Sequence, residues 1–173
     1  MKVVQRDITE ARVDYIVQQC NCLTVRSHGL SETLEKKFPH ANVYGGRRPV
    51  GSRNLAVPED RPIPGTAVIL QGSPNIVCLF GQWRPGKIRT PYFNSYPEAS
   101  CPETSTQRLI WFTSALWSFG NYLSQTSSGK VRIGIPWKIG CGLAGGSWDD
   151  YLSIIKRFSD IFEKVADVTL FSL

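Results

Sequence analysis

The feature that most constrains the fold of this chain is a cluster of four glycines within seven residues, Gly140 to Gly146. The apolar segment 131–136 before it reads as a buried strand, and 147–165 reads as an amphipathic helix. Ser147 suits the N-cap of that helix, with Asp150 as its capping-box partner. Glycines at this place allow backbone N–H groups to approach phosphate oxygens. The pattern predicts an α/β fold in which the glycine cluster binds phosphate. Alternatively, the cluster is only a turn that needs several positive φ angles.

The rest of the chain alternates between strand and helix patterns. We expect strands over 2–4, 14–19, 66–71, 76–80, 131–136 and 168–173, and helices over 30–38, 103–125 and 147–165. The strands at 66–71 and 76–80 read as a hairpin, whereas 40–64 and 81–100 read as irregular. This order predicts helices on both faces of a mixed, mostly parallel central sheet, in a single domain that spans 1–173.

Composition and cysteine usage narrow the functional classes. The net charge of +6 fits either anionic partners, such as phosphates and nucleic acid, or a solvated basic surface. The five cysteines form no C-x-x-C pair, and His28 and His40 lack zinc spacing from them, so we expect no metal and no cofactor. No apolar run reaches the length of a membrane span, and the first ten residues have no signal core. We therefore expect a cytoplasmic or nuclear protein without membrane partners.

Two familiar nucleotide loops fit the glycine cluster poorly. A Walker A loop ends in Gly-Lys-Ser/Thr, and the segment "GGSW" lacks the lysine. Gly140, Gly142 and Gly145 match G-x-G-x-x-G, but that fingerprint belongs to a unit that continues into further βαβ elements. Here a single predicted strand follows, so a Rossmann dehydrogenase has little support.

The N-terminal half adds a second signal. Asp7 comes directly after the first strand, and Asn21 closes the second. The carboxylate of Asp7 can accept a hydrogen bond from an adenine amino group, and Asn21 can bond sugar hydroxyls. Alternatively, both are turn-forming residues.

In these stretches the chain resembles the macrodomain family. The matching motifs are "DIT" at 7–9, "IVQQCN" at 16–21, "SHGLS" at 27–31 and "IPWKIGCGLAGGSW" at 135–148. Together they span nearly the whole chain. The "GCGLAGG" loop is most similar to the branch that contains terminal ADP-ribose protein glycohydrolase and the yeast-type ADP-ribose 1''-phosphate phosphatase. The resemblance implies a three-layer α/β/α macrodomain.

The resemblance also implies ADP-ribose as the ligand. By motif position, Asp7 and the backbone of Ile8 contact adenine, and Asn21 faces the distal ribose. Gly29 is the retained glycine of the first ligand-binding loop. Phe171 lies near the adenosine or belongs to the core. The phosphates are then wrapped by the backbone of Gly140, Cys141, Gly142, Leu143, Ala144 and Gly145.

The chain departs from the family pattern in both loops. A triple glycine is replaced by "SHG", so that only Gly29 is retained. The glycohydrolase branch has an acidic residue at the position of Ala144, and its loss argues against covalent lysine chemistry at Lys87. His28 lies in the first loop that matches the family motif, and an imidazole can act as a general acid or base, so His28 is a candidate catalytic residue. Alternatively, it is a loop histidine that forms a hydrogen bond with the backbone. Cys141 reads as a small filler residue.

Three functions follow from these observations. The first is a hydrolase that removes ADP-ribose from modified targets or dephosphorylates ADP-ribose 1''-phosphate. The second is a reader that binds ADP-ribose without turnover. The third is a nucleic-acid-binding module. The expected partners are ADP-ribose, ADP-ribosylated protein or nucleic acid, and the expected state is a monomer. The nucleic-acid reading rests on loop residues Arg47, Arg48, Arg53, Arg84, Arg89, Trp83 and Tyr92.

Overall fold

The computed structural model describes residues 1–173 and contains one six-stranded sheet in the order β1-β6-β5-β2-β4-β3. Neighbouring strands are parallel except β3 and β4, which form an antiparallel hairpin. The mixed, mostly parallel sheet is therefore confirmed. The strands are β1 (Lys2–Gln5), β2 (Tyr15–Gln19), β3 (Ala67–Leu70), β4 (Asn75–Leu79), β5 (Val131–Pro136) and β6 (Ala166–Ser172).

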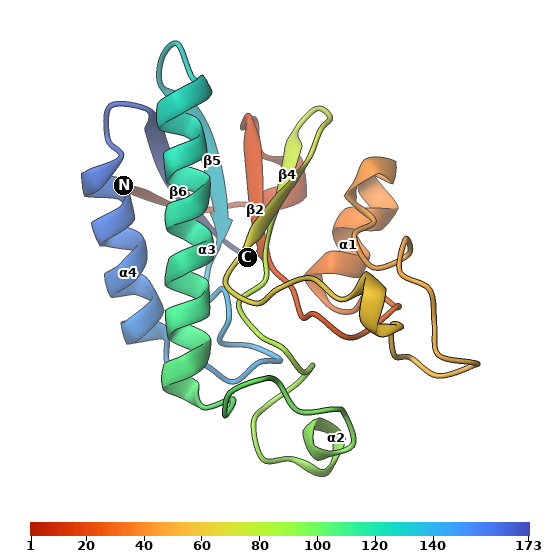
Figure 1. Cartoon of the computed structure of the whole chain (residues 1–173). Coiled ribbons are helices and arrows are strands. Elements are labelled where there is room, and N and C mark those ends of the chain that lie inside the picture. Colours follow the sequence, from red (N-terminus) through yellow and green to blue (C-terminus); the bar gives the residue numbers. More distant parts are fainter.

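Helices cover both faces of the sheet, as the alternating pattern predicts. In Figure 1, α3 and α4 lie side by side over one face, and α1 lies on the other. This is the expected three-layer α/β/α arrangement. The helices are α1 (Leu30–Lys37), α2 (Pro91–Asn94), α3 (Ser105–Thr126) and α4 (Trp148–Ile161), with short 3-10 turns η1 (Ile8–Glu10), η2 (Pro39–Ala41) and η3 (Pro58–Asp60).

Side chains of the central strands alternate between two hydrophobic clusters. Ile16 of β2 packs into the cluster beneath α1, and the next residue, Val17, packs into the cluster beneath α3 and α4. Ile76 and Val77 of β4 repeat this alternation. Successive strand side chains point to opposite faces, so two buried clusters require near-continuous apolar strands of this kind.

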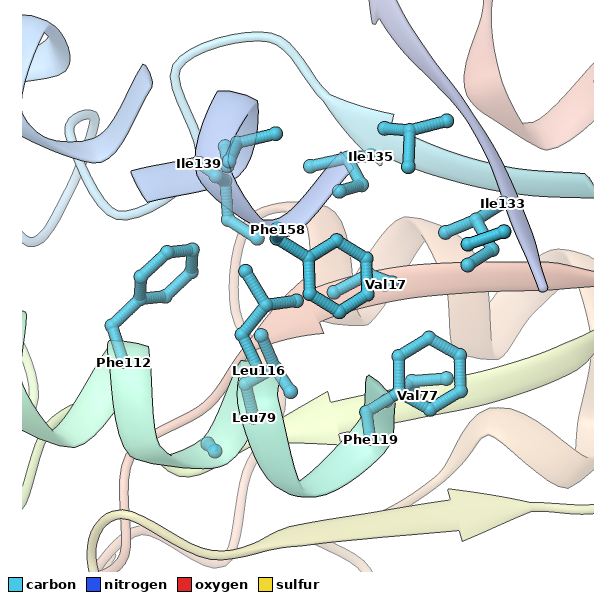
Figure 2. Packing of buried hydrophobic residues seen from close by; sticks show 14 of the residues in the cluster. Val17, Val77, Leu79, Phe112, Leu116, Phe119, Ile133, Ile135, Ile139 and Phe158 are labelled. Atoms are coloured by element: carbon cyan, nitrogen blue, oxygen red, sulfur yellow. The ribbon is translucent and has the colours of Figure 1, made fainter. Parts of the chain in front are cut away.

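The larger cluster is built on the apolar stripe of α3. Phe112, Leu116 and Phe119 are fully or almost fully buried, and Figure 2 shows them beside Phe158 of α4 and Val17 of β2. Their spacing of four and three residues is that of one helical face. Each buried side chain of this size contributes about 1.5–3 kcal/mol through removal of apolar surface from water.

Gly120 allows α3 and α4 to approach closely. A Cβ atom at this position would lie 2.4 Å from Cε2 of Phe162, whose ring is buried. An alanine normally stabilises a helix by up to ~1 kcal/mol relative to glycine. Here we expect Gly120→Ala to lower the free energy of unfolding by about 1–3 kcal/mol, because the core must shift to admit the methyl group. Urea unfolding measures the change.

The neighbouring exposed residue Asn121 supplies the control for this experiment. Asn121→Ala adds no clash and should change stability by no more than ~0.5 kcal/mol. A gain in stability for Gly120→Ala would contradict the tight packing of the two helices.

The sequence-based boundaries differ most from the structure in two places. The helix expected over 147–165 ends at Ile161, and β6 already begins at Ala166. The stretch 81–100, expected to be irregular, contains α2. Thr90 caps this helix by accepting a hydrogen bond from the N–H of Phe93, and Pro91 takes its first position, so its start signal was present in the sequence. None of the helices combines the length and apolar character needed to cross a membrane.

The parallel strands end together at one edge of the sheet. Gln19 of β2 pairs with Leu79 of β4, and Pro136 of β5 pairs with Phe171 of β6. The loops that follow β2, β4 and β5 therefore meet at this edge. Ligands of open α/β sheets bind outside the carboxyl ends of strands, so this edge is where a site is expected.

Candidate functional site

The glycine loop, which we define as Trp137–Ser147, connects β5 to α4. Gly140 and Gly145 have φ angles of 75° and 73°, which side-chain-bearing residues rarely adopt. A Cβ atom at Gly140 would also lie 2.5 Å from Cε1 of Tyr151. The loop closes on itself because the N–H of Gly146 donates to the carbonyl of Gly140 (3.0 Å). Gly142 differs from these glycines, since a Cβ atom there would meet nothing within 4 Å.

The β2–α1 loop, residues 20–29, lies opposite the glycine loop. Gly29 has a φ of 59°, and a Cβ atom there would lie 3.0 Å from Cδ1 of Leu143, so the tips of the two loops touch. Asn21 shapes the start of this loop, because its Oδ1 accepts from the N–H groups of Leu23 and Thr24 (2.9 Å each). Asn21 is thus a turn-forming residue whose amide oxygen is already bonded.

A cavity of about 310 Å³ lies between the two loops. His28 and Gly29 line one wall, and the glycine loop lines the other. His28 and Lys138 are the titratable side chains of this lining, which contains no carboxylate. The lining consists of Gln18, Gln19, His28, Gly29, Leu30, Ser31, Gln82, Pro136, Trp137, Lys138, Ile139, Gly140, Gly142, Leu143 and Ala144.

Free backbone donors belong to both walls of this cavity. The N–H groups of Gly142, Leu143 and Ala144 donate to no protein acceptor. Across the cavity, α1 begins at Leu30 without a side-chain cap, so the N–H groups of Leu30 and Ser31 are also unpaired. A helix start of this kind carries a partial positive charge, and free N–H groups in a loop form an anion-binding nest. The two walls together suit an anion with several oxygens.

Gln19 supplies an acceptor that lacks a partner. Its Nε2 donates to Oε1 of Gln82 (2.7 Å), but its own Oε1 is buried and accepts from nothing in the protein. A buried polar atom left unpaired costs about 1–3 kcal/mol, so native structures usually satisfy it with a ligand or water. Because Gln19 lines the cavity, a ligand hydroxyl is a suitable donor, in competition with the hydroxyl of Tyr151. Burial raises the pKa of Tyr151, and the Gln19 side chain partly opposes that rise.

A second cavity of about 450 Å³ lies on the other side of the glycine loop. It is lined by Gly145, Ser147 and Asp150 at the start of α4, and by Lys87 and Arg108. The start of α4, which we expected to face the phosphates, therefore lines this second cavity. Ser147 occupies the N-cap position but makes no side-chain cap bond, so the predicted capping box is wrong.

His28 and Lys87, the two candidate catalytic residues, lie on opposite sides of the glycine loop. His28 lines the first cavity, and the Lys87 side chain lines the second, where its Cγ lies 2.8 Å from the position of a Cβ on Gly145. Ala144 lines both cavities. A ligand held in the first cavity is thus separated from Lys87 by the loop backbone.

A buried ion pair between Glu103 and Arg108 anchors the loops around the site. The two side chains are 2% and 3% exposed, and Nε of Arg108 lies 2.9 Å from Oε2 of Glu103. Arg108 also donates to the carbonyl oxygens of Arg84 (2.9 Å), Gly86 (2.7 Å) and Ala144 (3.2 Å). One guanidinium therefore ties the glycine loop to the loop that carries Lys87.

Three residues of the site, Arg108, Gln19 and Gln82, were not predicted from the sequence. For Arg108 the sequence did contain a usable signal. Arg108 precedes Phe112 by four residues and so falls on the buried stripe of α3. A charge on such a stripe requires a buried partner. The two glutamines gave no signal, because their place in the cavity depends on how distant loops fold together.

Asp7 and Ile8 lie at the end of β1, outside the lining of either cavity. Asp7 caps the turn η1, and its Oδ1 accepts from both the N–H and the Oγ1–H of Thr9 (2.9 Å each). These bonds hold the pKa of Asp7 below its ordinary value. Its Oδ2 makes no protein hydrogen bond, so it stays available as an acceptor. Ile8 is buried in the cluster beneath α1.

Phe171 and Cys141 have mainly structural surroundings. Phe171 is 9% exposed and packs in the cluster beneath α1. Its carbonyl accepts from the N–H of Trp137 (2.8 Å), which ties β6 to the start of the glycine loop. Burial raises the pKa of the Cys141 thiol to about 11, so it is protonated at neutral pH, which agrees with a filler role.

Comparison of sequences alone finds no relative, since no protein-family model and no curated protein matches the chain. Comparison of structures does find proteins with a similar fold. The macrodomain of Mycobacterium tuberculosis DarG aligns with a TM-score of 0.68 at 12% identity, over 99% of this chain and 97% of that one. The macrodomain of Thermus aquaticus DarG aligns with a TM-score of 0.62 at 16% identity, over 99% and 97%.

A third solved structure carries a ligand. Thermosipho africanus DarTG in complex with ADP-ribose aligns with a TM-score of 0.64 at 14% identity, over 97% of this chain and 40% of that one. Alignments of this extent at such low identity establish the arrangement of the elements. Together with the sheet order, they confirm the resemblance seen in the sequence, and the chain has the macrodomain fold.

Proposed function

We propose that this protein binds ADP-ribose in the cavity between the glycine loop and the β2–α1 loop. The observation that carries the proposal is the pair of facing donor sets, with free N–H groups at Gly142, Leu143 and Ala144 on one wall and at the start of α1 on the other. Two facing donor sets match a diphosphate better than a single phosphate. The DarTG structure in complex with ADP-ribose, which shares the fold, supports this choice of ligand.

Hydrogen-bond acceptors are also available for the ribose hydroxyls and the adenine amino group of ADP-ribose. The unpaired Oε1 of Gln19 can accept a hydrogen bond from a ribose hydroxyl. The free Oδ2 of Asp7 can accept one from the adenine amino group, as the sequence motif implies. Asn21, whose amide oxygen is bonded within its own turn, contributes mainly by shaping the loop.

Calorimetric titration tests this proposal. ADP-ribose should bind with a dissociation constant in the micromolar range, or roughly −8 kcal/mol. AMP should bind much more weakly, because it reaches only one of the two donor sets. Equal affinities for AMP and ADP-ribose would contradict a site built for a diphosphate.

Hydrolysis of ADP-ribosyl linkages is a second candidate function, and the position of His28 favours it. His28 lines the same cavity as the free donors, whereas Lys87 lies behind the loop. The lining offers no carboxylate, so water activation would depend on His28 and on the ligand's own phosphates. The substrates to test are ADP-ribosylated protein, ADP-ribosylated nucleic acid and ADP-ribose 1''-phosphate.

If the protein turns over one of these substrates, His28→Ala should lower kcat by about 100-fold or more, the usual contribution of a general acid or base. The affinity for ADP-ribose should change far less, because such an interaction acts mainly in the transition state. Lys87→Ala is the matched control and should retain most activity. Equal losses in both variants, or a covalent adduct on Lys87 seen by mass spectrometry, would contradict this mechanism.

A further inference from the structure

The residue directly after β5, Trp137, has a partly exposed indole ring at the cavity between the two loops. Its side chain is 36% exposed, and it belongs to the lining of that cavity. Trp137 is the only tryptophan, tyrosine or phenylalanine in this lining. An aromatic ring in the wall of a cavity is a suitable surface for a flat ligand group, because flat rings attract each other when they stack with an offset.

Contacts of the backbone and of the ring hold Trp137 in place. Its N–H donates to the carbonyl of Phe171 (2.8 Å), and the centroid of its ring lies 4.9 Å from that of Trp148 on α4. The next residue, Lys138, has a φ of 61°, a conformation that side-chain-bearing residues rarely adopt and that is concentrated at functional sites. A ring that is already ordered by its neighbours loses little conformational freedom when a ligand binds, so it favours binding.

Trp137 and Asp7 lie on the two sides of β6 at its carboxyl end. On one side of β6 the N–H of Arg6 donates to the carbonyl of Ser172, and on the other the N–H of Trp137 donates to the carbonyl of Phe171 (2.8 Å each). Neighbouring strands are ~4.8 Å apart, so about 10 Å separates β1 from β5 across β6. A flat base over the end of β6 can therefore contact the indole ring and reach the free Oδ2 of Asp7, which lies outside the cavity lining.

We propose that Trp137 binds the adenine base of ADP-ribose by stacking, and that this contact makes the site selective for purine nucleotides. The base lies over the end of β6, with its amino group toward Asp7 and the diphosphate toward the free N–H groups of the glycine loop. The inference rests on the proposed function, because the bound diphosphate brings the base to Trp137. A purine has two fused rings for stacking and a pyrimidine has one, so the stack favours the purine.

Calorimetry with ADP-ribose and uridine diphosphate ribose tests the proposal, because these ligands differ only in the base. The unchanged protein should bind ADP-ribose at least about 10-fold more tightly than the uridine analogue. Trp137→Ala should weaken ADP-ribose binding about 10-fold, as expected for the loss of one base–aromatic stack, and should remove most of the preference for the purine. Trp137→Phe keeps a flat ring and should bind ADP-ribose within about threefold of the unchanged protein.

Tryptophan fluorescence supplies a readout that a purely structural role of Trp137 would not change. ADP-ribose should quench the emission of the unchanged protein, because the base stacks on one of its five tryptophans. Trp137→Phe should still bind ADP-ribose but lose most of the quenching. Trp117→Phe is the matched control and should keep the quenching, because Trp117 packs against Phe158 and Phe162 and lies outside the cavity lining.

Three results would overturn the stacking proposal, and they separate it from the proposed function. If the unchanged protein binds neither ligand, the proposed function fails together with the stack. If the unchanged protein binds ADP-ribose and Trp137→Ala binds it equally well, ADP-ribose binding stands and only the stack fails. If Trp137→Ala weakens the binding of both ligands by the same factor, the indole ring contacts the ribose instead of the base, and the purine selectivity fails.

Discussion

Gly142→Glu should abolish ADP-ribose binding while leaving the fold intact. Gly142 lines the cavity, its φ is not in the positive range that favours glycine, and a Cβ atom there meets nothing within 4 Å. The new side chain therefore fits the loop without strain, but it places a carboxylate beside the donors that hold the phosphates. We expect the dissociation constant to rise more than about 100-fold, equivalent to ~2.7 kcal/mol. Calorimetry measures the affinity, and thermal unfolding measures the stability.

Gly129→Glu is the matched control for this variant. Gly129 also has open space around its Cβ position and an ordinary φ, but it lies in the turn before β5, at the opposite edge of the sheet. The same charge change there should leave affinity unaltered. Normal ADP-ribose binding by Gly142→Glu would show that the glycine loop is only a turn.

Arg108→Met should cause a large loss of stability. The side chain is 3% exposed, pairs with Glu103 and donates to three carbonyl oxygens. Removal of one partner from a buried pair costs about 3–5 kcal/mol, because the remaining charge stays buried without compensation. Loss of the bond to Ala144 should also loosen the glycine loop and weaken ADP-ribose binding. Urea unfolding and calorimetry measure the two effects.

A second arginine in an exposed pair gives the control for Arg108. Arg132 is paired with Asp14 (3.1 Å), and both side chains are substantially exposed. Arg132→Met should cost no more than ~1 kcal/mol. If Arg108→Met alone does not fold, the double variant Glu103→Gln/Arg108→Met, which removes both charges, should recover part of the lost stability. Equal effects for Arg108→Met and Arg132→Met would contradict the anchoring role of the buried pair.

The sequence predicted the fold well because periodicity is a local signal. The apolar stripe of α3, with Phe112, Leu116 and Phe119 at helical spacing, can be found without knowledge of what it covers. The alternation of strands and helices then left few arrangements other than a sheet covered on both faces. The hairpin of β3 and β4 was likewise visible in two strand patterns separated by a short turn.

The candidate site was only partly predictable, because its chemistry depends on contacts between distant segments. The sequence identified the glycine loop, and it predicted that the partial positive charge at the start of α4 would face the phosphates. In the structure the start of α1 faces the first cavity instead, and the start of α4 lines the second. The sequence named His28 and Lys87 together, although the loop backbone at Ala144 separates them. Which side of a loop a residue reaches is decided by tertiary packing, which spacing along the chain does not encode.

The most direct test of the ligand site is a titration of the isotope-labelled protein with ADP-ribose, followed by amide NMR. We predict that the largest shifts occur at the free N–H groups of Gly142, Leu143 and Ala144 and at Leu30 and Ser31 across the cavity. Amides around the second cavity, such as those of Ser105 and Thr106, should move little. Shifts confined to the second cavity, with Gly142, Leu143 and Ala144 unchanged at saturation, would contradict a diphosphate site between the two loops.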